Sequence, residues 1–313
     1  MKTYANSDLF LIIDKANVAE STKKNYKNIL KGIEFVSENK SIIDLLQQPE
    51  ILIDKLWSNI NIKNKAGYVK MKDYLKVILA LSKHDKKFSK LIPLNEWRKY
   101  FNEINDVVVE YYSQNEPTKR QQLGYISFNE LILIRDKLAS GSIEKLLLML
   151  YTSIPPARND YWNVEIIKSN EEPSTDNYLI FNENDAKLIL RKYKTSKTYG
   201  NIETILPDEL FQEIKLSLKY WPRKYLFTKM NKKKEQTGIP YSSSNSFNSW
   251  ANKTLQNISK NKFLTLTMLR NIYVNRSDLN LSSASISEKK KIAKRMGHSW
   301  IEQQQYYSWH SWK

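Results

Sequence analysis

The hydrophobic period changes twice along this chain, and this change restricts its fold class more than any other feature. Apolar residues recur at helical spacing before residue 155 and again after residue 207. Between these regions lie four short runs rich in β-branched and aromatic residues, namely YWNVEIIK, NYLIFNE, KLILRKYK and NIETILP. The segment KTSKTYG between the last two runs, with Gly200 at its end, predicts a hairpin tip. We therefore expect a mainly α protein of the α+β class, with one small antiparallel sheet among helices.

The first third of the sequence predicts a small domain built from helices alone. The run ESTKKNYKNILKGIEFVSEN begins at a Ser21/Thr22 cap. Five of its apolar residues then fall on one face, namely Tyr26, Ile29, Leu30, Ile33 and Val36. Three later runs repeat this period and place lysines on the opposite faces: LIDKLWSNI, AGYVKMKDYLKVILALSKH and LNEWRKYFNEINDVVVEYY. Lysines of this kind are typical of a solvated helix face. We expect a helical domain over residues 1–116.

A polar segment follows this helical region. The run SQNEPTKRQQLG contains Pro117 and has no apolar period, which predicts a linker over residues 117–124. A second domain, residues 125–313, then begins with a capping box made by Ser127 and Glu130. The nearly apolar run SIEKLLLMLYTSI comes next and predicts a helix at the centre of this domain's core.

The charge of the chain favours a nucleic-acid partner. Lysine and arginine number 50 against 33 acidic residues, which gives a net charge of +17. An anionic membrane surface is the alternative, but the basic residues are spread along the chain and do not form one amphipathic helix. No run approaches the roughly 18 apolar residues that span a membrane. We expect double-stranded DNA as partner and no membrane.

The scarcity of metal-binding residue types excludes several kinds of site. The chain has no cysteine, which excludes disulfides, thiolate nucleophiles and cysteine metal sites. Its three histidines, His84, His298 and His310, include no pair at ligand spacing. The start of the chain shows no signal-peptide pattern. We therefore expect an intracellular protein with no metal and no cofactor.

Two arginines lie in apolar surroundings that favour a specific partner. Arg158 follows a Pro-Pro pair in IPPARNDYW, and Arg270 lies within LTLTMLRNIYV. Because a buried unpaired guanidinium is costly, each should meet an anion. That anion could be an internal carboxylate, such as Asp160 or Glu165. It could also be a phosphate, whose oxygens two guanidinium groups can hold together.

Other residues could complete a site for phosphoryl transfer. Lys194 and Lys197 lie on the predicted hairpin and could donate a proton to a leaving oxygen, although lysines at such tips are common. His298 follows Gly297 at a predicted helix end, where a lone histidine often caps or packs. Tyr307 lies nine residues after His298 and is one of 19 tyrosines. Each residue type is weak evidence by itself.

The order of these residues resembles a known pattern. An arginine, a hairpin lysine, T-x-x-R, G-H-S and a tyrosine nine residues after the histidine resemble the catalytic domain of tyrosine recombinases, the integrase family related in chemistry to type IB topoisomerases. The segment GHSWIEQQQYY is the most specific part. The segment PPARNDYWNVEI resembles the first-arginine box of integrases from large DNA viruses, virophages or transposons. The resemblance implies a DNA breaking-rejoining fold over 125–313 and a SAM-like core-binding domain over 1–116.

The resemblance also implies a role for each residue. Arg158 and Arg270 would bind the scissile phosphate, and His298 would hydrogen-bond it. Lys194, or its neighbour Lys197, would protonate the 5′ oxygen as it leaves. The tyrosine would form a 3′-phosphotyrosyl bond that conserves the phosphodiester energy, so that neither ATP nor a metal is needed. The resemblance further implies a homotetramer on paired DNA sites.

Two positions leave alternatives open. Thr267 stands where the family usually has a histidine, and threonine cannot act as a base near neutral pH. Loss of a general base costs on the order of a hundredfold in rate, so a DNA-binding regulator without cleavage is one alternative. A relaxing enzyme like the type IB topoisomerases is another.

Two neighbouring tyrosines could serve as the nucleophile. Tyr306 would point about 100° away from Tyr307 on a helix, so only one of the two can serve, and the spacing from His298 favours Tyr307.

Overall fold

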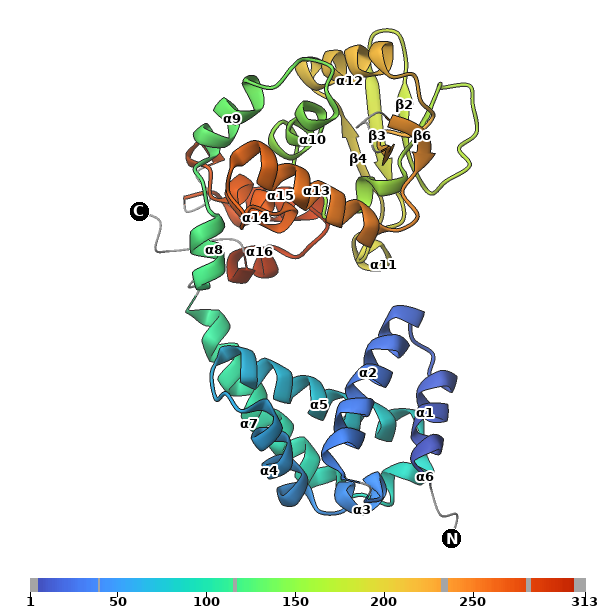
Figure 1. Cartoon of the computed structure of the whole chain (residues 1–313), viewed down its shortest axis with the longest axis vertical. Helices are drawn as coiled ribbons and strands as arrows, with labels where there is room; N and C mark the ends of the chain where they lie inside the picture. The colour runs from blue at the N-terminus through green and yellow to red at the C-terminus, as the bar shows by residue number, and fades with distance from the viewer. Residues whose placement is uncertain (1–4, 39, 115–116, 232–235, 280–282, 307–313) are drawn as a thin grey trace. The chain divides into compact units, whose positions relative to one another are not determined.

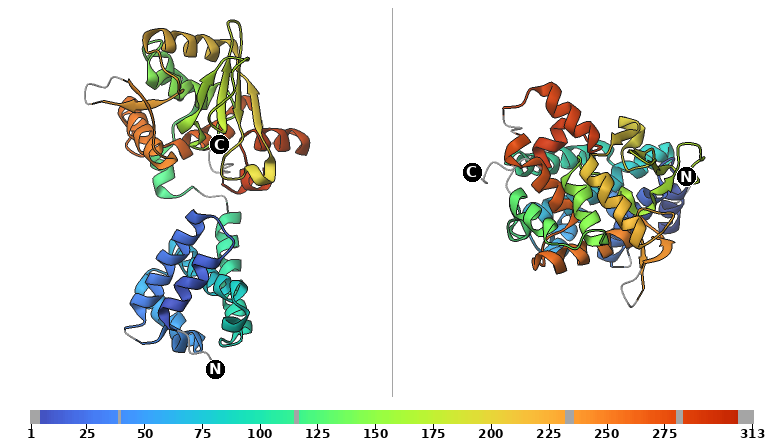
Figure 2. Two further views of the ribbon diagram at one scale, coloured as in Figure 1. Left: turned by 90° about the vertical axis from the view of Figure 1, so that its right-hand side faces the viewer. Right: turned by 90° about the horizontal axis from the view of Figure 1, so that it is seen from above.

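The chain folds into two compact units, Met1–Gln114 and Asn115–Lys313. The computed structural model describes residues 5–38, 40–114, 117–231, 236–279 and 283–306, apart from the side chains of 277 and 304–306 (Figures 1 and 2). Both units are mainly helical, and the four-stranded sheet lies in the second, as the change of hydrophobic period predicts, whereas a two-stranded sheet after residue 207 was not expected. None of the described helices combines the length and apolar character that crossing a membrane requires.

The first unit is helical throughout its described part. Its helices are α1 (Asn6–Lys15), α2 (Glu20–Val36), α3 (Ile42–Leu46), α4 (Pro49–Ile60), α5 (Lys65–His84), α6 (Lys86–Ser89) and α7 (Leu94–Ser113). Helix α5 packs against α1, α2, α4 and α7, and its apolar face, including Leu75 and Ile78, is fully buried. Trp97 of α7 is buried, and its indole nitrogen donates to the Leu46 carbonyl oxygen at 2.9 Å. The lysine-rich faces therefore remain outside a continuous apolar core.

The segment predicted as a linker, residues 117–124, lies inside the second unit. Residues 119–124 form helix α8 (Lys119–Gly124), which Thr118 and Gln121 start with a capping box. The Leu123 carbonyl oxygen accepts from Asn261 Nδ2 at 3.0 Å, and a Cβ added at Gly124 would lie 2.6 Å from the Phe263 carbonyl oxygen. Close packing with residues 261–263 therefore makes α8 part of the second unit.

The remaining helices of the second unit include one that is almost entirely buried. They are α9 (Phe128–Asp136), α10 (Ile143–Thr152), α11 (Ser196–Tyr199), α12 (Asp208–Tyr220), α13 (Ser244–Ser259), α14 (Leu266–Val274), α15 (Ile286–Arg295) and α16 (Trp300–Tyr306), with short 3₁₀ turns η1 (Asp160–Asn163) and η2 (Ser277–Leu279). Helix α10 contacts α9, α12, α13 and α14, and eight of its ten residues are buried, as its apolar sequence predicts (Figure 1).

A four-stranded sheet lies in the middle of the second unit's sequence. Its order is β1 (Glu165–Ile167), β2 (Asn177–Phe181), β3 (Ala186–Leu190) and β4 (Ile202–Ile205). Strands β2, β3 and β4 pair antiparallel, as expected, but β1 pairs parallel to β2, with Glu165 opposite Tyr178. A second, two-stranded sheet joins β5 (Thr228–Met230) to β6 (Gln236–Pro240).

The parallel pairing of β1 has a local cause. The Glu165 carboxylate accepts from Ser174 N at 2.6 Å, Ser174 Oγ at 2.8 Å and Thr175 N at 3.1 Å. These bonds hold the connecting segment beside the start of β1. The chain therefore enters β2 next to Glu165 and runs in the same direction as β1, instead of turning back as a hairpin.

Candidate functional site

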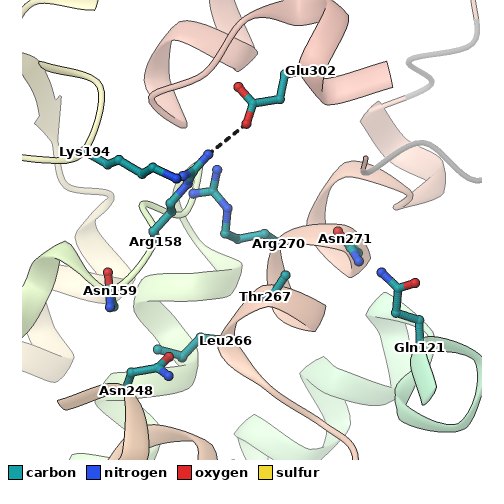
Figure 3. A pocket seen from close by; sticks show the side chains of 10 residues that line it. All are labelled: Gln121, Arg158, Asn159, Lys194, Asn248, Leu266, Thr267, Arg270, Asn271 and Glu302. Carbon is teal, nitrogen blue, oxygen red and sulfur yellow. Dashed lines mark hydrogen bonds and ion pairs between the residues drawn. The ribbon is translucent and has the colours of Figure 1, made fainter. Parts of the chain in front are cut away.

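An open pocket of about 600 Å³ brings together segments that are far apart in the sequence (Figure 3). Four of the predicted site residues, Arg158, Lys194, Thr267 and Arg270, line it. They come from the loop after α10, the β3–β4 connection and helix α14. The other lining residues are Gln121, Asn159, Asn248, Leu266, Asn271 and Glu302.

Arg270 is held from two sides by backbone oxygens. It lies on α14, whose N-cap Thr265 accepts from Met268 N, and its side chain is 1% exposed. Its Nη1 donates to the Pro156 carbonyl oxygen at 2.5 Å, and its Nη2 donates to the Met296 carbonyl oxygen at 3.1 Å. The guanidinium group is therefore fixed in place by two loops before any ligand arrives.

The loop that carries Arg158 is held by two buried tyrosines. Tyr151 Oη donates to the Arg158 carbonyl oxygen, and Tyr161 Oη accepts from Ala157 N at 3.1 Å. Burial raises the pKa of both Tyr151 and Tyr161, so both hydroxyls stay protonated at neutral pH. The loop after the Pro-Pro pair is thus fixed, and it presents Arg158 to the pocket (Figure 3).

Arg158 forms an ion pair with a carboxylate that the sequence did not suggest. Its Nη2 lies 2.9 Å from Glu302 Oε1 on α16, and the two side chains are 26% and 32% exposed. Glu165 instead pairs with Lys224 at 2.8 Å. Burial raises the pKa of Asp160, and the charges of Arg270 and Arg158 oppose that rise, so Asp160 interacts electrostatically with both arginines.

The two hairpin lysines differ in where they lie. Lys194 is exposed and extends along the pocket towards the Arg158 guanidinium group, beside which the Arg270 guanidinium group lies (Figure 3). Lys197 lies on the short helix α11, which forms the tip of the predicted hairpin, and it is not among the residues that line the pocket. Of the two lysines, Lys194 is therefore the one that lines the same pocket as Arg158 and Arg270.

His298 lies next to this group and is uncharged at neutral pH. Its side chain is 1% exposed, and Nδ1 lies 3.1 Å from the Ser299 carbonyl oxygen, which can only accept. Nδ1 therefore carries the proton in the neutral ring. Burial, together with the positive charges of Arg270 and Arg158, lowers the pKa of His298 to about 3.

The predicted nucleophile, Tyr307, lies outside the described residues. Helix α16 ends at Tyr306, and it carries Glu302 at the pocket wall. Thr267 lies in the first turn of α14, exposed at the pocket, three residues before Arg270. The structure thus brings together five predicted positions, counting His298 by its electrostatic contact with both arginines.

Several pocket residues were not anticipated from the sequence. Glu302 had a signal available, because it is the only acidic residue after Glu288. Gln121 could have been found from the T-x-x-Q capping pattern that begins at Thr118. Asn159 and Asn248 had none, because isolated asparagines in loops and helix starts are common.

The charges in this pocket suit an anion of phosphate size. Lys194, Arg158 and Arg270 place three positive charges together, and Glu302 balances one of them. Within the part of the chain that the structure describes, no group of three or more His, Asp or Glu side chains could hold a metal ion. Two guanidinium groups and an ammonium group can bind phosphate oxygens and stabilise charge that develops on them.

Comparison with known proteins gives little further information. No protein-family model matches the sequence, and no curated protein matches it. A solved structure described as a XerA recombinase aligns over 98% of this chain and 95% of its own, with 13% sequence identity and a TM-score of 0.41. A likeness this weak carries no functional argument, which must therefore come from the residues of the pocket.

Proposed function

We propose that this protein is a site-specific DNA recombinase or integrase that cleaves and rejoins DNA through a 3′-phosphotyrosyl intermediate. The observation that supports it is the convergence of Arg158, Lys194 and Arg270 on one pocket, with Thr267 beside them. These residues span more than a hundred positions of the chain and occur in the order of the tyrosine-recombinase motifs. A surface formed by scattered lysines would not require this order.

In the proposed reaction, the scissile phosphate binds between the two guanidinium groups. The Tyr307 hydroxyl gives its proton to solvent water in the open pocket as its oxygen attacks phosphorus. The bond from phosphorus to the 5′ oxygen breaks, and the Lys194 ammonium group gives its proton to that oxygen. Arg158 and Arg270 stabilise the charge on the non-bridging oxygens. A 5′ hydroxyl of a second strand then reverses the steps, which joins the new strand and releases the tyrosine.

His298 takes part in this reaction as a hydrogen-bond donor to the phosphate. In the neutral ring Nε2 has no proton, since Nδ1 donates to the Ser299 carbonyl oxygen. Burial lowers the pKa of His298, and the charges of Arg270 and Arg158 lower it further. A bound phosphate offsets these two charges, so it raises the pKa and favours a proton at Nε2. His298 then partly compensates for Thr267, which can donate a hydrogen bond but cannot accept the tyrosine proton near neutral pH.

The two parts of the chain have separate tasks in this proposal. The helical domain, residues 1–116, binds duplex DNA through its lysine-rich faces, and residues 125–313 carry the chemistry. Four protomers bring two DNA sites together, as the chemistry of strand exchange between two duplexes requires. The resemblance of PPARNDYWNVEI to integrases of viral or transposon type favours a role in the movement of a mobile element.

A nicked suicide substrate tests the proposal directly. Cleavage of such DNA releases a short fragment that cannot religate, so a covalent protein–DNA adduct accumulates and is seen on a denaturing gel. We expect an adduct from the parent and from Tyr306→Phe, none from Tyr307→Phe, and no effect of EDTA. Absence of an adduct from both the parent and Tyr306→Phe would contradict the proposal.

Thr267 supports a second candidate, a DNA-binding regulator of the same fold without cleavage. This candidate predicts DNA binding that weakens steeply with salt concentration, because phosphate contacts dominate the affinity. It also predicts no covalent adduct from the parent or from either tyrosine variant. A relaxing enzyme of the topoisomerase kind predicts instead the relaxation of supercoiled DNA without preference for a site.

A further inference from the structure

The loop that carries Lys194 is attached to one glycine through both neighbours of the lysine. On one side, Thr195 Oγ1 donates to the Gly297 carbonyl oxygen at 2.6 Å. On the other, the Tyr193 ring packs against Gly297 so closely that an added Cβ would lie 2.9 Å from Tyr193 Cε2. Tyr193 Oη donates to the Gly200 carbonyl oxygen at 2.6 Å, which closes the loop behind the lysine.

The same glycine lies within the turn that holds Arg270 and His298. Gly297 has a φ of +70°, which favours glycine, and it ends helix α15. The residue before it, Met296, accepts from Arg270 Nη2 at 3.1 Å, and the residue after it is His298. The turn 296–298 therefore supports the lysine loop, the buried arginine and the histidine at once.

The Lys194 side chain gains its direction from this attachment. Lys194 is exposed, and no described carboxylate forms an ion pair with its ammonium group. A lysine side chain has four flexible bonds and loses much rotamer freedom when it is held in one place. A displacement of about 1 Å from a reacting atom can reduce a rate by about a hundredfold. The backbone on either side of Lys194 must therefore be held for its ammonium group to reach the pocket reproducibly.

We propose that Thr195 is a positioning residue, which holds Lys194 in place for proton transfer through its hydrogen bond to Gly297. This inference rests on the proposed function, because it needs a leaving oxygen that Lys194 protonates. It assigns the proton donor to Lys194 and not to Lys197, since the attachment lies directly beside Lys194 and Lys197 follows on α11, away from the pocket.

A substrate with a 5′-bridging sulfur separates positioning of the acid from general damage. When sulfur replaces the leaving 5′ oxygen, the group leaves as a thiolate, which needs no proton because a thiol has a pKa of about 8.5. We expect Thr195→Val, which keeps the shape and removes the hydroxyl, to cleave the oxygen substrate about 10- to 100-fold more slowly than the parent. The same variant should cleave the sulfur substrate at nearly the parental rate.

Two control variants complete the experiment. Thr195→Ser keeps the hydroxyl and should retain cleavage of both substrates, and Thr198→Val changes another threonine of the same loop, exposed and without this bond, and should also retain both. Thr195→Ala provides a second loss-of-hydroxyl variant if Thr195→Val folds poorly, as judged by its thermal unfolding.

The outcomes distinguish the inference from the proposed function. Equal slowing of Thr195→Val on both substrates, or no slowing on either, would overturn the positioning role while the parent still cleaves DNA. A parent that forms an adduct with neither substrate would overturn the proposed function and the role of Thr195 with it.

Discussion

The buried histidine predicts a defined loss of stability in mild acid. His298 is 1% exposed, and its pKa in the folded protein is about 3, against 6.5 in an unfolded chain. Below pH 6.5 the unfolded chain therefore binds a proton that the folded protein does not bind. The contribution of the neutral ring to stability is fully present above about pH 6.5, and it is lost as the pH falls from there towards 3.

The size of this loss follows from the two pKa values. Between pH 7 and pH 5, proton binding by the unfolded state lowers the free energy of unfolding by about 2 kcal/mol. Any folded-state pKa below about 4 gives nearly the same loss, because the folded protein then stays unprotonated at pH 5. The predicted loss therefore requires only that burial and the neighbouring Arg158 and Arg270 charges keep the ring uncharged at pH 5.

Urea unfolding of the full chain at pH 7 and pH 5 measures this effect. His298→Asn keeps an amide that can donate to the Ser299 carbonyl oxygen but has no group that titrates in this range. We expect the parent to lose about 2 kcal/mol more than His298→Asn between the two pH values. Asp160, whose pKa burial raises, and the first unit contribute alike to both proteins, so the difference isolates His298. Equal losses in both proteins would refute the reasoning.

Three further predictions concern the ligands of the pocket. Inorganic phosphate should raise the pKa of His298, which NMR titration of its ring proton measures; an unchanged pKa would contradict an anion site beside this ring. Arg270→Ala should destabilise the protein by about 2 kcal/mol or more because it leaves two carbonyl oxygens without a donor, whereas Arg158→Ala should cost about 1 kcal/mol or less in urea unfolding. Equal losses of stability in the two variants would contradict the reasoning from their different burial. Both variants should fail to form the covalent adduct but retain most DNA binding, since other phosphate contacts supply the affinity. Glu302→Gln removes the carboxylate that competes with DNA phosphate for Arg158, an ion pair worth about 1 kcal/mol, so it should tighten DNA binding about fivefold. Weaker binding of the variant in a filter-binding assay would contradict this competition.

The parts of the fold that local sequence determines were predictable. Helix α10 was expected because its run is apolar throughout, and the start of α9 because Ser127 and Glu130 form the capping box seen in the structure. The end of α15 was expected from Gly297, whose φ of +70° favours glycine. In each case the residues that decide the structure lie within a few positions of one another.

The features that were missed depend on contacts between distant residues. The parallel direction of β1 follows from bonds between Glu165 and residues 174–175, which alternation of apolar residues cannot reveal. The ion-pair partner of Arg158 is Glu302, 144 positions away, whereas of the nearby carboxylates that the sequence suggested only Asp160 interacts with it, without an ion pair. Residues 117–124 lack an apolar period, but they include helix α8, which packs closely against the backbone of residues 261–263. The spacing of apolar residues gives no information on such backbone packing.

The candidate site was predictable in its residue types and order, but not in its support. The order of motifs indicated Arg158, Thr267, Arg270 and His298, and the structure places all four at or beside one pocket. The sequence does not distinguish the two hairpin lysines, because both lie on the same loop three residues apart, whereas in the structure only Lys194 lines the pocket. The hydrogen bond from Thr195 to Gly297 joins residues 102 positions apart and has no sequence signal.

The ion pair between Arg158 and Glu302 changes how this pocket should respond to ionic strength. A DNA phosphate that binds Arg158 replaces a carboxylate that already belongs to the protein, so the exchange adds no net neutralisation of the duplex at that point. Each phosphate that a protein cation neutralises otherwise steepens the logarithmic salt dependence by about 0.9. This contact should be nearly silent in a salt titration as long as Glu302 keeps its charge. The net charge of +17 counts Arg158 and Glu302 separately, but as a pair they add no positive charge to the pocket.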